Sequence, residues 1–183
     1  LRYGRLAEVL LYDVRRTLTL AGPSAVYLDP EVEKWLKARM AEPEVAHLVH
    51  VPSNPPGWTA GKWGEWYPDV LGSDRKLTIK VAKPYWQSGW LKQHDRLMAA
   101  MTAMTARAPL VISGDLHAVG MGRMLRSGTL DMKANPINVV LSGPVGSRPG
   151  PEGWPSGRRG TGAMPSAHVE LDEQVKPIEQ HSF

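Results

Sequence analysis

Residues 108–118, Ala-Pro-Leu-Val-Ile-Ser-Gly-Asp-Leu-His-Ala, join an apolar run directly to a polar turn. Residues 109–112 are apolar and β-branched, which predicts a buried strand, and Gly114 allows a sharp turn after it. Asp115 and His117 are therefore expected at the carboxyl end of a strand, where open parallel sheets bind ligands. An oxygen donor and a nitrogen donor at this spacing suit a metal ion. The structural alternative is an aspartate that caps the turn beside a surface histidine.

Composition limits the class of protein. A chain of 183 residues, 42% hydrophobic and 22% charged, predicts one domain over residues 1–183. The absence of cysteine excludes disulfides, thiolate metal sites and a cysteine nucleophile, and it leaves periplasmic, secreted and cytoplasmic locations open. We find no signal peptide and no apolar run of membrane length. The net charge of +4 is scattered, so neither a membrane nor nucleic acid is expected as a partner.

The pattern of apolar segments predicts two βαβ units. Residues 8–14 predict a strand buried on both faces, and residues 45–51 predict a second strand. Between them, Asp29 and Pro30 are typical of the start of a helix. A helix with a methionine stripe over residues 90–107 then leads into the strand at 109–112. Further strands are expected at 119–125 and 137–142, with an antiparallel hairpin formed by residues 168–173 and 174–181.

Polar residues follow each of the three predicted parallel strands. Parallel pairing would place them on one edge of the sheet, although they are far apart in sequence. The residues are Asp13, Arg15, His50, Asn54, Asp115 and His117. Such a set suits a metal-assisted hydrolase of anionic esters, in which cations polarise a phosphoryl oxygen and arginine neutralises developing charge. The alternatives are structural: an ion pair of Asp13 with Arg15 or Arg16, and a structural role for His50 in its strand.

Two long segments rich in glycine and proline are expected to be loops, at residues 52–75 and 143–165. The first contains Trp58, Trp63 and Trp66, and this aromatic content argues for order. An ordered lid, a sugar-binding aromatic platform and a packed Ω-loop are its three interpretations.

Four motifs in order resemble a known family. They are Tyr-Gly-x-Leu-Ala-Glu-Val-Leu-Leu-Tyr-Asp-Val-Arg-Arg at 3–16, Val-Glu-Lys-Trp-Leu at 32–36, Ser-Gly-Trp at 88–90 with Arg96 and Leu97, and Ser-Gly-Asp-Leu-His-Ala at 113–118. The set is similar to the carboxyl-terminal half of alkaline phosphatase D, the PhoD-like metallophosphoesterases. This resemblance implies an α/β fold that is part of a four-layer α/β/β/α sandwich, with a mixed sheet containing parallel βαβ units. It also implies a multinuclear metal site that hydrolyses phosphate mono- or diesters, using calcium and iron, or manganese or zinc.

The resemblance assigns provisional roles to individual residues. Asp115 and His117 would be metal ligands, and Asp13 with Arg15 would form the family's Asp-x-Arg element. The full hypothesis assigns catalysis to Asp13, Arg15 and His50, and substrate binding to Asn54 and Arg96.

The family's amino-terminal metal-binding motifs do not occur in these residues. The expected partners are therefore a phosphate-ester substrate and the missing amino-terminal half of the same protein, and the fragment alone is expected to be inactive. The alternative function is a non-catalytic module on a phosphatase-like scaffold that binds a ligand or a partner through its aromatic loop.

Overall fold

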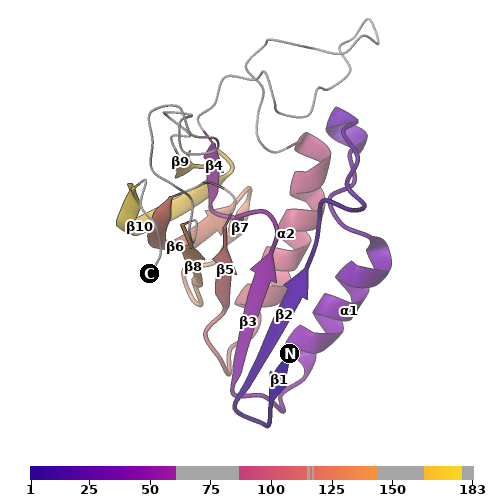
Figure 1. The fold of residues 1–183 in the computed structure, drawn as a ribbon, viewed down its shortest axis with the longest axis vertical. Coiled ribbons are helices and arrows are strands. Elements are labelled where there is room, and N and C mark those ends of the chain that lie inside the picture. Colours follow the sequence, from indigo (N-terminus) through magenta and orange to yellow (C-terminus); the bar gives the residue numbers. More distant parts are fainter. Residues whose placement is uncertain (61–86, 115, 117, 144–162, 179–183) are drawn as a thin grey trace, which may run out of the picture.

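The computed structural model describes residues 1–60, 87–114, 116, 118–143 and 163–178. It is an α/β fold built on an eight-stranded mixed sheet with the order β1-β2-β3-β5-β8-β6-β10, in which β7 pairs with β6 (Figure 1). These strands are β1 (Arg2–Tyr3), β2 (Ala7–Tyr12), β3 (His47–Pro52), β5 (Leu110–Ser113), β6 (Val119–Ser127), β7 (Leu130–Asp131), β8 (Ile137–Leu141) and β10 (Val169–Ile178). The helical elements are η1 (Gly22–Ser24), α1 (Pro30–Ala41) and α2 (Ser88–Thr102).

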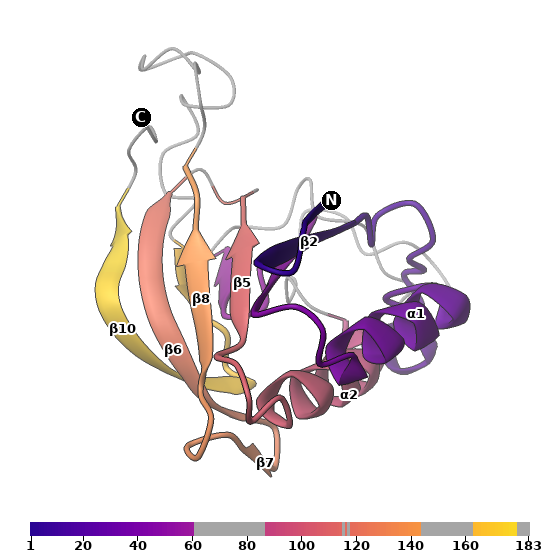
Figure 2. The ribbon, with the colours of Figure 1, turned by 90° about the horizontal axis from the view of Figure 1, so that it is seen from below.

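The parallel part of the sheet confirms the two predicted βαβ units. Strand β2 pairs in parallel with β3, β3 with β5, and β5 with β8. Helices α1 and α2 make the first two crossovers. Because both crossovers step across the sheet in the same direction with the same hand, both helices lie on one face, as Figure 2 shows.

Local sequence explains where the helices begin and end. The Asp29 carboxylate accepts a hydrogen bond from Glu31 N at 2.8 Å, and Pro30 occupies the first turn, as predicted. Helix α2 ends at Thr102, before the predicted end. The Asn135 amide donates to the carbonyls of Thr102 and Met104 and satisfies the groups left by the last turn.

The antiparallel part of the sheet differs from the prediction at the carboxyl terminus. Strand β6 confirms the expected strand and extends it to Ser127, between antiparallel β8 and β10. The predicted terminal hairpin is wrong, because residues 169–178 form one strand along β6. Register shifts along this pair accommodate the broken alternation that resembled a turn in sequence.

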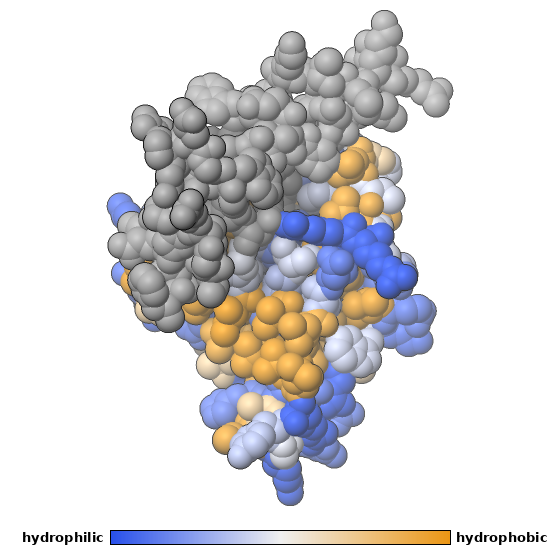
Figure 3. Space-filling view, in the orientation of Figure 1, coloured by the Kyte–Doolittle hydropathy of each residue, from blue (hydrophilic) through white to orange (hydrophobic). Residues whose placement is uncertain are grey.

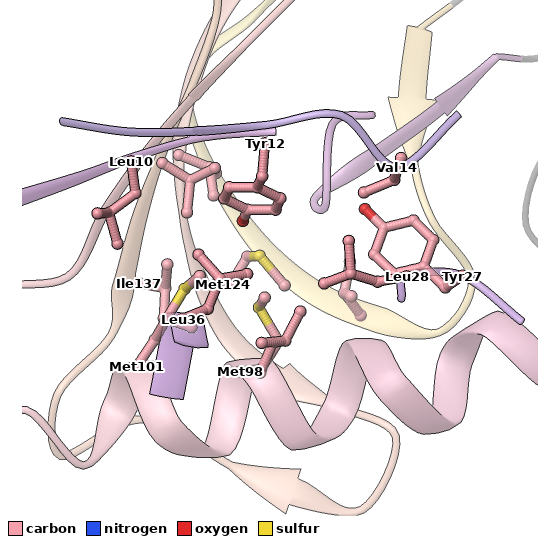
Figure 4. Close-up of a cluster of buried hydrophobic side chains, with 14 of the residues drawn as sticks. Leu10, Tyr12, Val14, Tyr27, Leu28, Leu36, Met98, Met101, Met124 and Ile137 are labelled. Atoms are coloured by element: carbon pink, nitrogen blue, oxygen red, sulfur yellow. The ribbon is translucent and has the colours of Figure 1, made fainter. Parts of the chain in front are cut away.

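The hydrophobic core lies between the sheet and the helices (Figure 4). Leu10, Leu48 and Val111 come from neighbouring strands and point toward α2, which contributes Met98 and Met101. The methionine stripe of α2 is therefore core packing, as expected.

The two predicted loops contain regular structure where they approach each other. Strand β4 (Trp58–Ala60) pairs with β9 (Ala163–Pro165), one strand from each segment. Trp58 is fully buried and donates from Nε1 to Glu173 Oε1 at 3.1 Å, so this tryptophan is a core residue. Trp63, Trp66 and the rest of residues 61–86 and 144–162 lie outside the described residues, and their interpretation is untested.

The sheet face opposite the helices is apolar and only partly covered. Burial of β2 on both faces was predicted, but Leu11 is 57% exposed. The face continues through half-buried Val49, Val51, Leu110 and Ile112. Figure 3 shows a hydrophobic patch over β2, β3 and β5. Along each strand, side chains of this face alternate with side chains that are buried on the helix-facing side. Because both sets are apolar, these strands have nearly continuous apolar sequences.

Among the described residues, no helix has the length and apolar character needed to span a membrane.

Candidate functional site

The carboxyl ends of the parallel strands define the candidate site. Tyr12 is in register with Pro52, and Ser113 with Leu141, so the four strands end along one edge of the sheet. We call this the carboxyl edge. The predicted residues that follow β2 and β3 therefore emerge side by side.

Asp13 connects the loop after β2 to the loop after β3 through hydrogen bonds. Its Oδ1 accepts hydrogen bonds from Arg15 N at 2.8 Å and from Ser53 Oγ at 3.0 Å. The Ser53 hydroxyl in turn accepts from Val14 N at 2.9 Å. The Asp13 residue remains exposed, so its carboxylate combines a structural role with access to solvent.

Arg15 and Asn54 meet across the two strands. Arg15 Nε donates to Asn54 Oδ1 at 3.5 Å, and Asn54 is buried while Arg15 is exposed. The buried amide thus holds one side of an exposed guanidinium. The structure brings together Asp13, Arg15 and Asn54, as the topology predicted, while their chemical roles stay predictions.

Asp115 and His117 lie outside the described residues. The backbone on both sides of them follows β5 at the carboxyl edge, where Ser142 N donates to Ser113 O at 2.7 Å. Leu116 and Ala118 are buried. The Ser113 hydroxyl is buried and has no hydrogen-bond partner among the described residues.

His50 does not join the exposed part of the carboxyl edge. Its ring is fully buried on the helix-facing side of β3, edge-on to Tyr12 with 6.0 Å between ring centroids. Burial, and secondarily the charge of Arg107, lowers the pKa of His50 to about 4, so the ring is neutral near pH 7. Neither ring nitrogen has a hydrogen-bond partner among the described residues, and the predicted catalytic role of His50 stays a prediction.

Arg96 contacts α1 instead of the other predicted residues. Its Nε and Nη2 donate to Glu33 Oε1 and Oε2 at 2.7 and 2.8 Å. Hydrogen bonds from Arg96 are the largest cause that lowers the pKa of Glu33, which falls to about 2. Burial raises this pKa, and hydrogen bonds from Lys37 and Gln93 lower it further. The described contacts of Arg96 are those of an ion pair between helices, and its predicted part in substrate binding has no support from them.

A second polar cluster was not predicted. His94, Asp95 and His168 place one possible metal-binding atom each within 4.8 Å of the others. His168 Nε2 lies 2.8 Å from Asp95 Oδ1, and His94 Nδ1 lies 3.2 Å from the same oxygen. Burial raises the pKa of Asp95, but hydrogen bonds from His94, Ser127 and His168 outweigh it and hold that pKa well below its usual range. The adjacent His-Asp pair was the available sequence signal, but nothing in the sequence linked it to a residue 73 positions later.

Comparison with known proteins supports the fold. No protein-family model matches the chain, and no curated protein matches it. Among solved structures, that of PhoD matches with a TM-score of 0.50 and 15% sequence identity, over 78% of this chain. The fold is PhoD-like. The match covers 28% of the PhoD chain, so this chain corresponds to part of that protein's length.

Proposed function

We propose that this chain supplies the carboxyl-terminal half of the site of a metal-dependent phosphoesterase that hydrolyses phosphate mono- or diesters. The observation that carries the proposal is the Arg15–Asn54 contact beside Asp13 at the carboxyl edge of a PhoD-like sheet. A fold of this kind is shared by unrelated activities, so the argument rests on the residues at this edge.

The donor atoms of the predicted site fit metal ions. Asp13 presents an exposed carboxylate after β2. In the sequence, Asp115 and His117 follow β5, which ends at the same edge. Carboxylates suit calcium and iron, and the imidazole widens the choice to manganese and zinc. When bound, such ions supply Lewis acidity for hydrolysis at phosphorus.

Arg15 is proposed to bind the phosphate group. A guanidinium donates through several N–H groups in a fixed plane and matches phosphate oxygens better than an ammonium does. Asn54 Oδ1 lies 3.5 Å from Nε, and the Asp13 carboxylate accepts from the Arg15 backbone N–H, which supports a guanidinium beside both residues at this edge. It would neutralise charge that develops on the phosphoryl oxygens.

A second sheet is proposed to cover the apolar face opposite the helices. The amino-terminal half of the same protein would supply it and complete a four-layer α/β/β/α sandwich. The exposure of Leu11 beside Val49, Val51 and Ile112 supports this arrangement, because sheet faces of this composition are normally packed. The larger size of PhoD, of which the match covers 28%, is consistent with such a partner.

The test is hydrolysis by the longer protein that contains this sequence. Chromogenic phosphate mono- and diesters are assayed with calcium, iron, manganese and zinc. We expect Asp115→Asn and His117→Ala to lower turnover by at least about 10²-fold with little change in melting temperature. His47→Gln, an exposed histidine at the start of β3, is the matched control. Full turnover in both site variants with unchanged metal content would reject the assignment.

A further inference from the structure

We propose that His94, Asp95 and His168 form a binding site for a divalent transition-metal ion of the zinc type. The site stabilises the fold, and its three residues are distinct from those assigned to the carboxyl edge. Strand β6 runs antiparallel to β8, and Ser127, which contacts the cluster, lies beyond the residue paired with Ile137 at the start of β8. The proposal is independent of the phosphoesterase assignment.

The donor set fits this class of metal. Two imidazole nitrogens and one carboxylate oxygen are a common three-residue set for zinc, with a water as a further ligand. At zinc–ligand distances of about 2.0–2.2 Å, neighbouring donors in a tetrahedron lie about 3.3–3.5 Å apart. The observed separations from Asp95 Oδ1 are 2.8 Å to His168 Nε2 and 3.2 Å to His94 Nδ1. All three donor atoms lie within 4.8 Å of one another, so small adjustments of the side chains would bring them around one ion.

The surrounding residues hold the donors in place. Ser127 Oγ donates to Asp95 Oδ1 at 2.7 Å, the type of outer contact that orients a ligating carboxylate. Gly128 N donates to His168 O at 2.8 Å and so fixes the backbone of the histidine. Gly128 has a φ of 55°, and a Cβ there would lie 3.0 Å from Asp95 Oδ2 and from His168 Cε1. Glycine at this turn therefore leaves room for the cluster.

The site is closed on one side and open on the other. The His94 side chain is 2% exposed, whereas those of Asp95 and His168 are 33% and 23% exposed. A hydrated ion can thus approach from the His168 side and exchange waters for protein donors. The three ligands come from α2 and from the segment before β10, so a bound ion would join two parts of the chain far apart in sequence.

A hydrogen-bonded cluster without metal is the competing explanation. In that state each imidazole directs an N–H at the Asp95 carboxylate. A metal ion needs the lone pair of one nitrogen on each ring, so in the metal-bound state the N–H of each ring lies on its other nitrogen. Saturable binding of one ion per chain that depends on all three residues distinguishes the metal site from the hydrogen-bonded cluster.

The experiment measures Zn²⁺ binding to the 183-residue chain carrying Asp115→Asn and His117→Gln, which removes the two predicted metal ligands of the carboxyl edge. After chelator treatment, the protein is titrated with zinc by calorimetry, and bound zinc is counted by elemental analysis. We expect one ion per chain and a higher melting temperature with zinc.

Adding His168→Gln is expected to weaken binding at least about tenfold, and Asp95→Asn likewise. His47→Gln, at an exposed position, is expected to leave affinity unchanged. Circular dichroism confirms that the variants fold, and the partly exposed position of His168 makes it the safer substitution. Absence of saturable zinc binding in the folded protein, or affinity unchanged by both His168→Gln and Asp95→Asn, would overturn the proposal.

Discussion

Arg15 and Arg96 each donate hydrogen bonds to a side-chain oxygen, but their surroundings differ. We therefore expect the two arginines to have different functions. Arg15 is exposed at the carboxyl edge and contacts a neutral amide, Asn54. Arg96 contacts the carboxylate of Glu33, which is buried between the helices. The first contact joins an exposed guanidinium to a neutral amide, and the second satisfies a buried anion.

Arg15→Lys is expected to lower phosphoesterase turnover in the longer protein by about 10²-fold, because the planar fork of N–H donors is lost while the positive charge remains. The melting temperature should change little, since the residue is exposed. Arg16→Lys, at the neighbouring exposed position, is the control. Steady-state kinetics in which Arg15→Lys matches the parent protein would remove Arg15 from the site.

The lowered pKa of Glu33 predicts that the protein loses stability in acid. Its pKa is about 2 in the folded protein against a usual 4.5, so its contribution is present above pH 4.5 and is lost as the pH falls toward 2. We expect about 2 kcal/mol of unfolding free energy to disappear over that window, allowing for the half-exposed side chain of Arg96. Urea unfolding at a series of pH values measures it.

Glu33→Gln should remove this pH-dependent part of the stability. Glu31→Gln is the matched control, because Glu31 lies on the same turn of α1 and is exposed. Equal slopes of stability against pH in Glu33→Gln and in the parent chain would show that the Glu33–Arg96 pair is not its source.

At the scale of elements, helix α2 shows which buried residues can be predicted from the periodicity of the sequence and which cannot. The spacing of Leu97, Met98 and Met101 identified the core side of the helix. Gln93 is polar, yet it is buried and accepts from Tyr27 N at 2.8 Å while donating to Leu28 O at 2.8 Å. Periodicity cannot identify such a residue, because its partners are backbone groups of a distant segment.

Gly89 marks the closest approach between α2 and the segment that contains η1. A Cβ at this position would lie 2.4 Å from the backbone N and O of Ala25. Gly89→Ala is therefore expected to destabilise the fold by about 2 kcal/mol or more, despite the better helix propensity of alanine. Thermal unfolding tests this, with Ser88→Ala as the control at the adjacent exposed position. A stabilised Gly89→Ala variant would contradict the close packing.

For the whole molecule, the sequence was sufficient to predict that β2, β3 and β5 are parallel and that one edge collects Asp13, Arg15 and Asn54. It did not predict the pairing of β10 along β6, the β4–β9 pair, or the meeting of Asp95 with His168. The predicted parallel pairs followed from βαβ topology, a rule that acts between consecutive elements. The missed contacts join distant segments through packing, for which a single sequence carries no comparable rule.

The apolar sheet face predicts different behaviour in the short and long forms of the protein. In the 183-residue chain, Leu11→Lys should leave stability within about 0.5 kcal/mol and reduce binding of a hydrophobic dye, because Leu11 is exposed there. In the longer protein the same change should destabilise, since it would bury an unpaired charge. Trp35→Lys, an exposed position on α1, is the control. Equal effects of Leu11→Lys in both forms would argue against a covering sheet.

The most direct test of the central claim is anomalous diffraction from crystals of the longer protein grown with manganese or zinc and inorganic phosphate. The account predicts metal peaks at the carboxyl edge, bound by Asp115 and His117, with phosphate oxygens in contact with Arg15. The proposed His94–Asp95–His168 ion would give a separate peak and does not decide this question. A well-ordered carboxyl edge that holds neither metal nor phosphate under these conditions would contradict the proposed phosphoesterase site.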